Sequence, residues 1–245
     1  MLLDPLFDTS FPDGVCPYRY PLSLASDFSG MEAAGFALSA FPFFQHRWAC
    51  DWGEQPRLFI AANFPNAPCH RDITTRTPAA GPVTFYVAGP PCQPFASNGR
   101  RKGESDPRSS LFGTTIDSII EFLPITFAVE NSNLVATVRK GQFLRETCDR
   151  LTDAGYCVSH KILNTHNLGL PNNRKRIWIV GTRSDCVVAP LSWHTHIKPI
   201  ALSDLLIPLE HDISKPHYRP LAPTAAKPST WPLLMLIAQA FSTTG

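Results

Sequence analysis

Residues 83–95 read VTFYVAGPPCQPF, and the interpretation of the whole chain starts from this segment. Its first six residues are mostly β-branched or aromatic, a composition that favours a buried strand. The GPPCQP segment then ends the strand abruptly, because proline fixes φ and has no backbone N–H to donate. Cys92 therefore follows a strand on a stiff backbone, which suits a reactive thiol. A free cysteine is more often a small core residue, and both interpretations stay open.

Strand patterns alternate with helix patterns on both sides of this segment. The alternation predicts an α/β fold with a mostly parallel, Rossmann-like sheet that carries helices on both faces. In such a sheet, ligands bind beyond the carboxyl ends of the strands. Residues 99–110 lack apolar periodicity and predict a mobile surface loop. The predicted strands span 22–28, 47–51, 83–88, 125–130, 156–163 and 177–181, and the predicted helices span 30–40, 55–63, 111–122 and 141–154.

The composition is that of a globular protein. Of 245 residues, 44% are hydrophobic and 17% are charged, which excludes a highly charged disordered chain. The net charge of +2 creates no global field for nucleic-acid binding, so any basic surface must be local. The 24 prolines are about twice the usual share, and they are denser at the two ends, with four in residues 1–21 and eight in residues 190–245. We predict an N-terminal lead at 1–21, a main domain at 22–183 and a Pro-rich region at 184–245.

The seven cysteines indicate a reducing compartment. They include no CxxC pair and no histidine spacing typical of zinc, which argues against a disulfide scaffold and a metal site. The apolar run at 233–238 is too short to span a bilayer. We therefore expect a soluble intracellular protein with no membrane span and no bound metal. Apart from Cys92, the cysteines are predicted to be structural: Cys16, Cys50, Cys69, Cys148, Cys157 and Cys186.

Two further segments carry groups capable of chemistry. Glu130 ends the predicted strand ITFAVE, where partial desolvation favours a protonated carboxyl that can donate a hydrogen bond. A solvated cap is the alternative for this residue. Arg174 and Arg176 flank Lys175, so strand alternation directs both guanidiniums to one side as an anion or carboxylate clamp. A solvated basic turn is the alternative there.

Three motifs together resemble those of the cytosine-5 DNA methyltransferase family. GPPCQPF at 89–95, VEN at 129–131 and NNRKR at 172–176 are similar to its central motifs in order and separation. The segment 99–112 is also similar to the mobile catalytic loop of that family. The resemblance covers roughly residues 22–183 and implies the class I S-adenosylmethionine-dependent methyltransferase fold.

This resemblance implies covalent catalysis at C5 of cytosine in DNA. Cys92 would add as a thiolate to C6 of a cytosine flipped out of the duplex. Glu130 would hydrogen-bond N3 and the exocyclic amine. Arg174 would orient Glu130 or the base carbonyl, while Arg176 would favour the thiolate form of Cys92. The phosphate contacts of the loop are assigned to Arg100, Arg101, Lys102 and Arg108.

The same resemblance implies S-adenosyl-L-methionine as the methyl donor. Phe28 and Gly30 match the first motif, where glycine allows a close backbone approach. Asp51 would accept from the ribose hydroxyls, Trp52 would cover the adenine, and Asp72 would meet the adenine amino group. The alternatives place Phe28 and Trp52 in the core and make turn caps of Asp51 and Asp72. The predicted cofactor-binding residues are Phe28, Gly30, Asp51, Trp52, Asp72, Ile73 and Pro91.

The sequence departs from the family pattern in two places. Met31-Glu32-Ala33 stands where the family usually has a pair of glycines, so the methionine moiety would meet a different surface there. After about Thr182 the chain is short and Pro-rich, and we find neither a large target-recognition domain nor the C-terminal motifs of the family. We expect the Pro-rich region to be a remnant of the target-recognition region in a truncated chain.

Three functions stay open from the sequence. The leading one is a DNA methyltransferase. The second is a tRNA methyltransferase, because one branch of the family keeps GPPCQPF and a small recognition region suits a substrate read by its shape. The third is a non-catalytic remnant that binds nucleic acid or nothing. The expected partner is DNA, or alternatively tRNA. The expected compartment is the nucleus of a eukaryote or the cytoplasm of a prokaryote.

Overall fold

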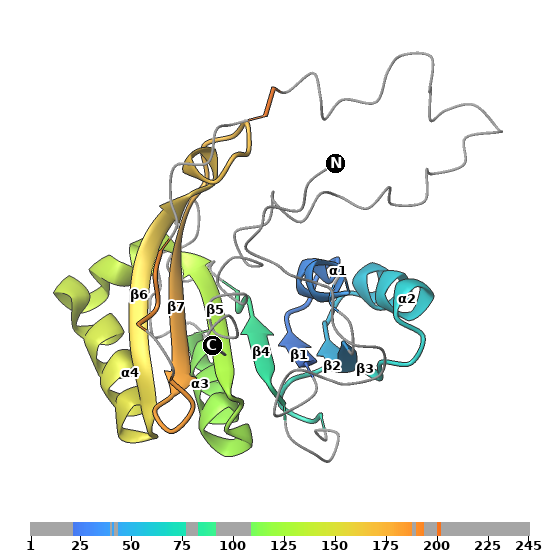
Figure 1. The fold of residues 1–245 in the computed structure, drawn as a ribbon, viewed down its shortest axis with the longest axis horizontal. Coiled ribbons are helices and arrows are strands. Elements are labelled where there is room, and N and C mark those ends of the chain that lie inside the picture. The colour runs from blue at the N-terminus through green and yellow to red at the C-terminus, as the bar shows by residue number, and fades with distance from the viewer. Residues whose placement is uncertain are drawn as a thin grey trace, which may run out of the picture.

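The computed structural model describes residues 22–39, 41, 44–76, 83–91, 109–187, 190–193 and 200–201. Within these ranges, seven strands form one sheet in the order β3-β2-β1-β4-β5-β7-β6 (Figure 1). The strands are β1 (Ser23–Asp27), β2 (Gln45–Cys50), β3 (Cys69–His70), β4 (Phe85–Ala88), β5 (Thr126–Ser132), β6 (Tyr156–Asn164) and β7 (Lys175–Arg183). The helices are α1 (Ala33–Leu38), α2 (Glu54–Asn63), α3 (Ser109–Phe122) and α4 (Gln142–Asp153), with 3-10 turns η2 (Asn133–Gly141) and η3 (Thr165–Asn167).

Five neighbouring strands of the sheet are parallel. β3, β2, β1, β4 and β5 all run in one direction, whereas β7 is antiparallel to both β5 and β6. The mostly parallel α/β sheet predicted from the sequence is therefore confirmed. Because the parallel strands end at the same edge, the segments that follow them lie along that edge. The described residues selected from the sequence after β1, β2 and β3, such as Phe28, Asp51 and Asp72, follow the strand ends at this edge.

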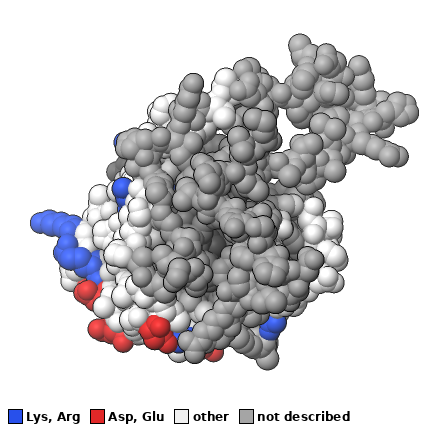
Figure 2. Space-filling view, viewed as in Figure 1, with Lys and Arg blue, Asp and Glu red and all other residues white. Residues whose placement is uncertain are grey.

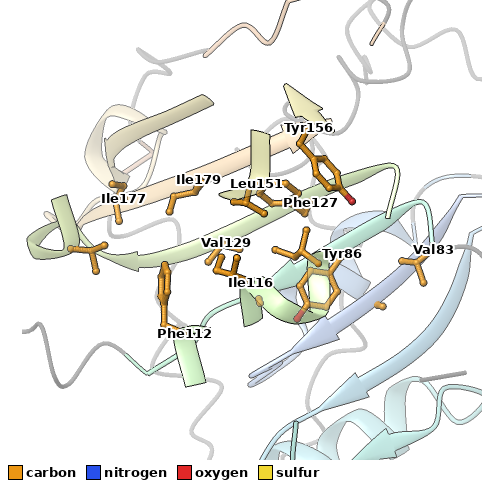
Figure 3. Close-up of a cluster of buried hydrophobic side chains, with 14 of the residues drawn as sticks. Val83, Tyr86, Phe112, Ile116, Phe127, Val129, Leu151, Tyr156, Ile177 and Ile179 are labelled. Carbon is orange, nitrogen blue, oxygen red and sulfur yellow. The ribbon is translucent and has the colours of Figure 1, made fainter. Parts of the chain in front are cut away.

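Side chains alternate between two cores on opposite faces of the sheet. On one face, Phe127 and Val129 of β5 pack with Ile116 of α3 and Leu151 of α4 (Figure 3). On the other face, Ala128 belongs to a cluster that includes residues of β1 and α1. This alternation places helices on both faces, as the sequence predicted.

Gly181 of β7 shows how closely the two antiparallel strands pack. It lies directly opposite Phe127 of β5. A Cβ atom at position 181 would lie 2.5 Å from Cε1 of the Phe127 ring, closer than two carbon atoms can approach. Glycine is thus required here because the aromatic ring occupies the place of its side chain.

Three details of the predicted secondary structure are wrong. β5 does not end at Glu130 but continues to Ser132, because Ser132 pairs with Arg176 of β7. The predicted loop at 99–110 is too long, since α3 begins at Ser109. The two-residue strand β3 was not predicted, because so short a segment carries no periodicity. The remainder of that loop, residues 99–108, lies outside the described residues, as does the lead at 1–21.

Among the described helices, none is long and apolar enough to cross a membrane. Five of the six cysteines predicted to be structural are described, and none of these five forms a disulfide bond. Burial raises the pKa of Cys50 to about 12, and burial also raises the pKa of Cys69 and Cys148. These three thiols are poor nucleophiles. Cys157 is exposed.

Candidate active site

A cavity of about 360 Å³ lies at the carboxyl edge of the sheet. It is bordered by the ends of β1, β4 and β5 and by the hairpin of β6 and β7. Phe28, Glu130, Arg174 and Arg176 all line it, so the structure brings together one predicted cofactor residue and three predicted catalytic residues. The volume falls within the range of small-molecule sites. A larger cavity of about 570 Å³, lined by residues 44–47 and 63–68, contains none of the predicted site residues.

Glu130 and Arg176 form an ion pair in this cavity. Arg176 Nε lies 2.9 Å from Glu130 Oε1, and both side chains are more than two-thirds buried. Burial raises the pKa of Glu130, although the charges of Arg176 and Arg174 and the hydrogen bond from Arg176 oppose that rise. The carboxyl is therefore desolvated yet held by a cation, so it can act as a hydrogen-bond donor or acceptor. The alternative of a solvated strand cap does not describe this residue.

Asn131 ties the GPPC segment to β5. Its buried side-chain amide donates to the carbonyl of Pro90 over 3.2 Å, and its Oδ1 accepts from the backbone of Ser132 over 2.7 Å. Gly89 lies beside the Glu130 carboxyl, since a Cβ atom there would be 3.8 Å from Glu130 Oε2. Asn131 belongs to the VEN motif but had no predicted role. Its position directly after Glu130 is the sequence signal for its role, which is to hold the carbonyl of Pro90 next to β5.

The turn after β1 has an unusual backbone. Phe28, Gly30 and Glu32 all have φ near +55°, a left-handed conformation that costs energy for residues other than glycine. The end of β2 holds this turn, because Gly30 N–H donates to Asp51 Oδ2 over 2.8 Å. No atom lies within 4 Å of the place where a Cβ of Gly30 would stand, so the turn is open there. In this structure the carboxylate of Asp51 therefore holds the backbone of the turn at Gly30.

Trp52 is 64% exposed, which excludes the alternative that it is a core residue. The guanidinium of Arg71 lies over its ring, 4.4 Å from the ring centre.

Asp72 caps the turn that follows β3, since its Oδ1 accepts from both the backbone and the hydroxyl of Thr74. These two hydrogen bonds lower the pKa of Asp72. Ile73 is buried.

Glu32 is a wall residue of the cavity that the sequence analysis treated only as a departure from the family pattern. It is 1% exposed, and its Oε2 accepts from Ser26 Oγ over 2.5 Å. Its Oε1 accepts from Gly35 N–H over 3.2 Å and so caps the start of α1. Burial raises the pKa of Glu32 to about 7. The sequence carried no signal for this, because a glutamate beside a turn is normally exposed.

Cys92 and the basic residues of the loop lie outside the described residues. Of the predicted cofactor-binding residues, Phe28 lines the cavity, whereas the other six do not: Gly30, Asp51, Trp52, Asp72, Ile73 and Pro91. Figure 2 shows both basic and acidic side chains along one rim of the described surface. Arg150 on α4 forms an ion pair with Asp117 on α3. In the described part of the chain, no group of three or more His, Cys, Asp or Glu side chains is arranged to hold a metal ion.

Curated relatives of known class align with this chain. The Type II methyltransferase M.HaeII of Haemophilus aegyptius is 29% identical over 213 residues, which cover 83% of this chain and 66% of the relative. M.HpaII of Haemophilus parainfluenzae is 36% identical over 151 residues, which cover 60% of this chain and 42% of the relative. The chain therefore spans about two-fifths to two-thirds of the length of these relatives.

Solved structures share the fold. EhMeth, a methyltransferase of Entamoeba histolytica, superimposes with a TM-score of 0.60 at 18% identity over 77% of this chain and 61% of its own. A putative DNA modification methyltransferase encoded within an Escherichia coli prophage superimposes with a TM-score of 0.59 at 18% identity, over 73% and 52% of the two chains. The family model for C-5 cytosine-specific DNA methylase matches residues 22–217, which is most of the chain. By its sequence motifs, its sheet and this match, the chain belongs to the C-5 cytosine-specific DNA methylase family.

Proposed function

We propose that this protein transfers a methyl group from S-adenosyl-L-methionine to C5 of cytosine in DNA. The observation that supports this most directly is the shared cavity. The Glu130–Arg176 pair and the Phe28 turn border the same space, so a base held by the pair would lie beside a cofactor held by the turn. We assign the reaction to the domain predicted at 22–183.

The residues present fit this cofactor. The open side of Gly30 and the glycine at position 89 leave room for a ligand at the ends of β1 and β4. The exposed ring of Trp52 offers an aromatic face for an adenine. When bound, S-adenosyl-L-methionine supplies an electrophilic methyl group on its sulfonium. Phe28, Gly30 and Asp51 would hold it, together with Trp52, Asp72, Ile73 and Pro91.

In the proposed reaction, Cys92 does the covalent chemistry. Its thiolate adds to C6 of a cytosine that has left the base stack, which makes C5 nucleophilic. C5 then takes the methyl group, loses its proton to a base, and eliminates the Cys92 thiolate to restore the ring. The carbonyl of Pro90, two residues before Cys92 in the sequence, accepts from Asn131 directly after Glu130, which supports assigning the GPPCQPF motif and Glu130 to one site.

Glu130 supports the addition by meeting N3 and the exocyclic amine of the base. As electrons move toward C5 and N3 on thiol addition, a carboxyl that donates to N3 stabilises the developing charge. Burial raises its pKa, which favours the protonated form needed for that donation. Arg176 holds the orientation of Glu130 through its 2.9 Å contact, and Arg174 lies in the same cavity wall. The basic residues Arg100, Arg101, Lys102 and Arg108 would contact DNA phosphates.

The test is methyl transfer from labelled S-adenosyl-L-methionine to duplex DNA and, in parallel, to tRNA. We expect label in DNA as 5-methylcytosine, identified by mass spectrometry of the nucleosides. Label in tRNA alone would contradict the DNA assignment and support the tRNA alternative. A calorimetric titration that shows no binding of S-adenosyl-L-methionine would favour the non-catalytic remnant, whether or not the protein binds nucleic acid.

A further inference from the structure

Glu32 is a buried acid in the cavity wall, and no Lys or Arg of the described ranges forms an ion pair with it. Its ion-pair contact there is with His46, whose Nε2 lies 3.7 Å from Glu32 Oε2. Burial lowers the pKa of His46 to about 4, so this ring is neutral at pH 7 and cannot neutralise the carboxylate. The remaining partners of Glu32 are neutral donors, Ser26 Oγ and Gly35 N–H.

The other two acids in the same cavity wall are paired with strong cations. Arg76 binds both carboxylate oxygens of Asp27, which also accepts from the Tyr86 hydroxyl. Glu130 is paired with Arg176. Among these acids, Glu32 alone has its charge uncompensated by a Lys or Arg of the described residues. A buried carboxylate without a cation is unstable, and the cavity beside it can admit a cation with a ligand.

We propose that Glu32 supplies negative charge in the wall beside the sulfonium of the bound cofactor, and that this charge raises the affinity of the site for the sulfonium cofactor relative to its thioether product. This inference rests on the proposed function. A sulfonium carries a fixed positive charge, whereas the sulfur of S-adenosylhomocysteine is neutral after the methyl group has left. The same carboxylate therefore favours the cofactor before transfer and loses its partner afterwards, which promotes product release.

The proposal has a measurable consequence in protons. Without ligand, the carboxyl of Glu32 is about half protonated at pH 7, because its pKa is about 7. A cation bound beside it favours the carboxylate, and the carboxylic proton passes to the buffer. Fixing Glu32 as the carboxylate would release about 0.5 proton per ligand at pH 7 and about 0.1 at pH 8.

Other groups facing Glu32 contribute less to this release. Asp27 raises the pKa of Glu32 through its charge but is held by Arg76. His46 of β2 is already neutral, and the thiol of Cys69 stays protonated because burial raises its pKa. Glu130 also lines the cavity and is paired with Arg176, so it can release protons of its own on ligand binding. The Glu32→Gln variant separates the protons of Glu32 from those of Glu130.

The experiment is isothermal titration of the full chain with S-adenosyl-L-methionine in two pH 7 buffers of different ionisation enthalpy. The difference in heat gives the protons released per ligand bound. We expect about half a proton for the wild type and close to none for Glu32→Gln, which keeps the size and the acceptor of the cap. Glu121→Gln, an exposed position on α3, is the matched control and should behave as the wild type.

S-adenosylhomocysteine and adenosine complete the design. Both should release markedly fewer protons, because neither carries a sulfonium. At pH 8 the preference of the wild type for S-adenosyl-L-methionine over S-adenosylhomocysteine should exceed that of Glu32→Gln by about tenfold. If Glu32→Gln does not fold, Glu32→Asp, which keeps the charge, should retain both the release and the preference.

Each contrary outcome is distinct. Equal proton release in the wild type and Glu32→Gln would overturn the role of Glu32, and so would equal release on binding of cofactor and product. Both results leave the proposed function standing, because the cofactor still binds. A wild type that does not bind S-adenosyl-L-methionine would overturn the proposed cofactor and this inference together.

Discussion

Arg176 on β7 reaches Glu130 on β5 diagonally across the sheet. Glu130 pairs with Trp178 and Arg176 pairs with Ser132, so the two residues lie two positions apart in register and share a face. The 2.9 Å contact follows from this register. The extension of β5 to Ser132 therefore has a functional consequence, because a strand that ended at Glu130 would not fix the guanidinium beside the carboxyl.

Replacing Arg176 should change the pH dependence of methyl transfer. The charge of Arg176 and its hydrogen bond lower the pKa of Glu130, so Arg176→Met should raise that pKa. In single-turnover kinetics, the limb of the pH–rate profile that reports Glu130 should move to higher pH. Glu130→Gln should slow the covalent step by about 10²-fold or more. A profile for Arg176→Met that overlays the wild type would remove this pair from the mechanism, and Arg150→Met, on the outer surface, is the control.

Asn131 should matter for turnover more than for folding. Asn131→Ala removes the hydrogen bond to the Pro90 carbonyl and leaves that acceptor buried, at a cost of about 1–3 kcal/mol in the free energy of unfolding. We expect a fall in kcat with little change in cofactor affinity, because Cys92 loses its anchored approach. Asn66→Ala, at an exposed position, should leave both unchanged. Wild-type kcat in Asn131→Ala would show that the anchor is dispensable.

Gly181→Ala should destabilise the protein without touching the cavity. The added methyl would collide with the Phe127 ring, and overpacking of this kind costs about 1–3 kcal/mol. Gly113→Ala is a matched control on α3, where no atom lies within 4 Å of the new Cβ. That change should be neutral or stabilising by about 0.5–1 kcal/mol, since alanine favours a helix. Urea unfolding measures both, and equal midpoints for the two variants would refute the packing argument.

Glu32 and His46 should give the folded protein opposite pH dependences. The pKa of Glu32 is raised from 4.5 to about 7, so its contribution to stability is complete below pH 4.5 and is lost as the pH rises through 7. The unfolding free energy of the wild type relative to Glu32→Gln should thus fall by about 3 kcal/mol over that interval. The pKa of His46 is lowered to about 4, so its contribution is present above pH 6.5 and is lost on acidification.

Urea titrations between pH 4 and 8 test both signs. The wild type compared with His46→Gln should gain stability as the pH rises from 4 to 6.5, the reverse of the comparison with Glu32→Gln. A flat difference between the wild type and Glu32→Gln over the whole range would contradict the buried acid.

The sequence predicted the order and type of the long elements, and it selected Phe28, Glu130, Arg174 and Arg176, which line one cavity. Hydrophobic patterning was sufficient for the elements, since buried strands such as β4 and amphipathic helices such as α4 have strong periodicity. The family motifs pointed to Arg174 as the residue that orients Glu130 or the base carbonyl, whereas Arg176 forms the ion pair with Glu130 in the structure. The sequence contained no information on the register that places them diagonally.

Other features depend on tertiary structure that no local pattern encodes. From the sequence alone, Trp52 fits either the core or the cofactor site. Its exposure in the structure and the guanidinium of Arg71 over its ring exclude the core. The burial of Glu32 arises because the turn directs its side chain under α1, toward Ser26 and Gly35. The demand for glycine at 181 comes from a ring on the neighbouring strand. Each depends on a contact between residues from separate elements or across a turn.

Covalent trapping tests the central claim most directly. Duplex DNA in which 5-fluorocytosine replaces the target cytosine should hold the enzyme in a covalent complex when S-adenosyl-L-methionine is present, since the fluorine cannot leave as a proton does. We predict a denaturation-resistant complex, with the peptide containing Cys92 attached to the base, and no complex from Cys92→Ser although this variant still binds the cofactor. A wild type that methylates DNA without forming the complex, or a Cys92→Ser variant that forms it equally well, would contradict the account.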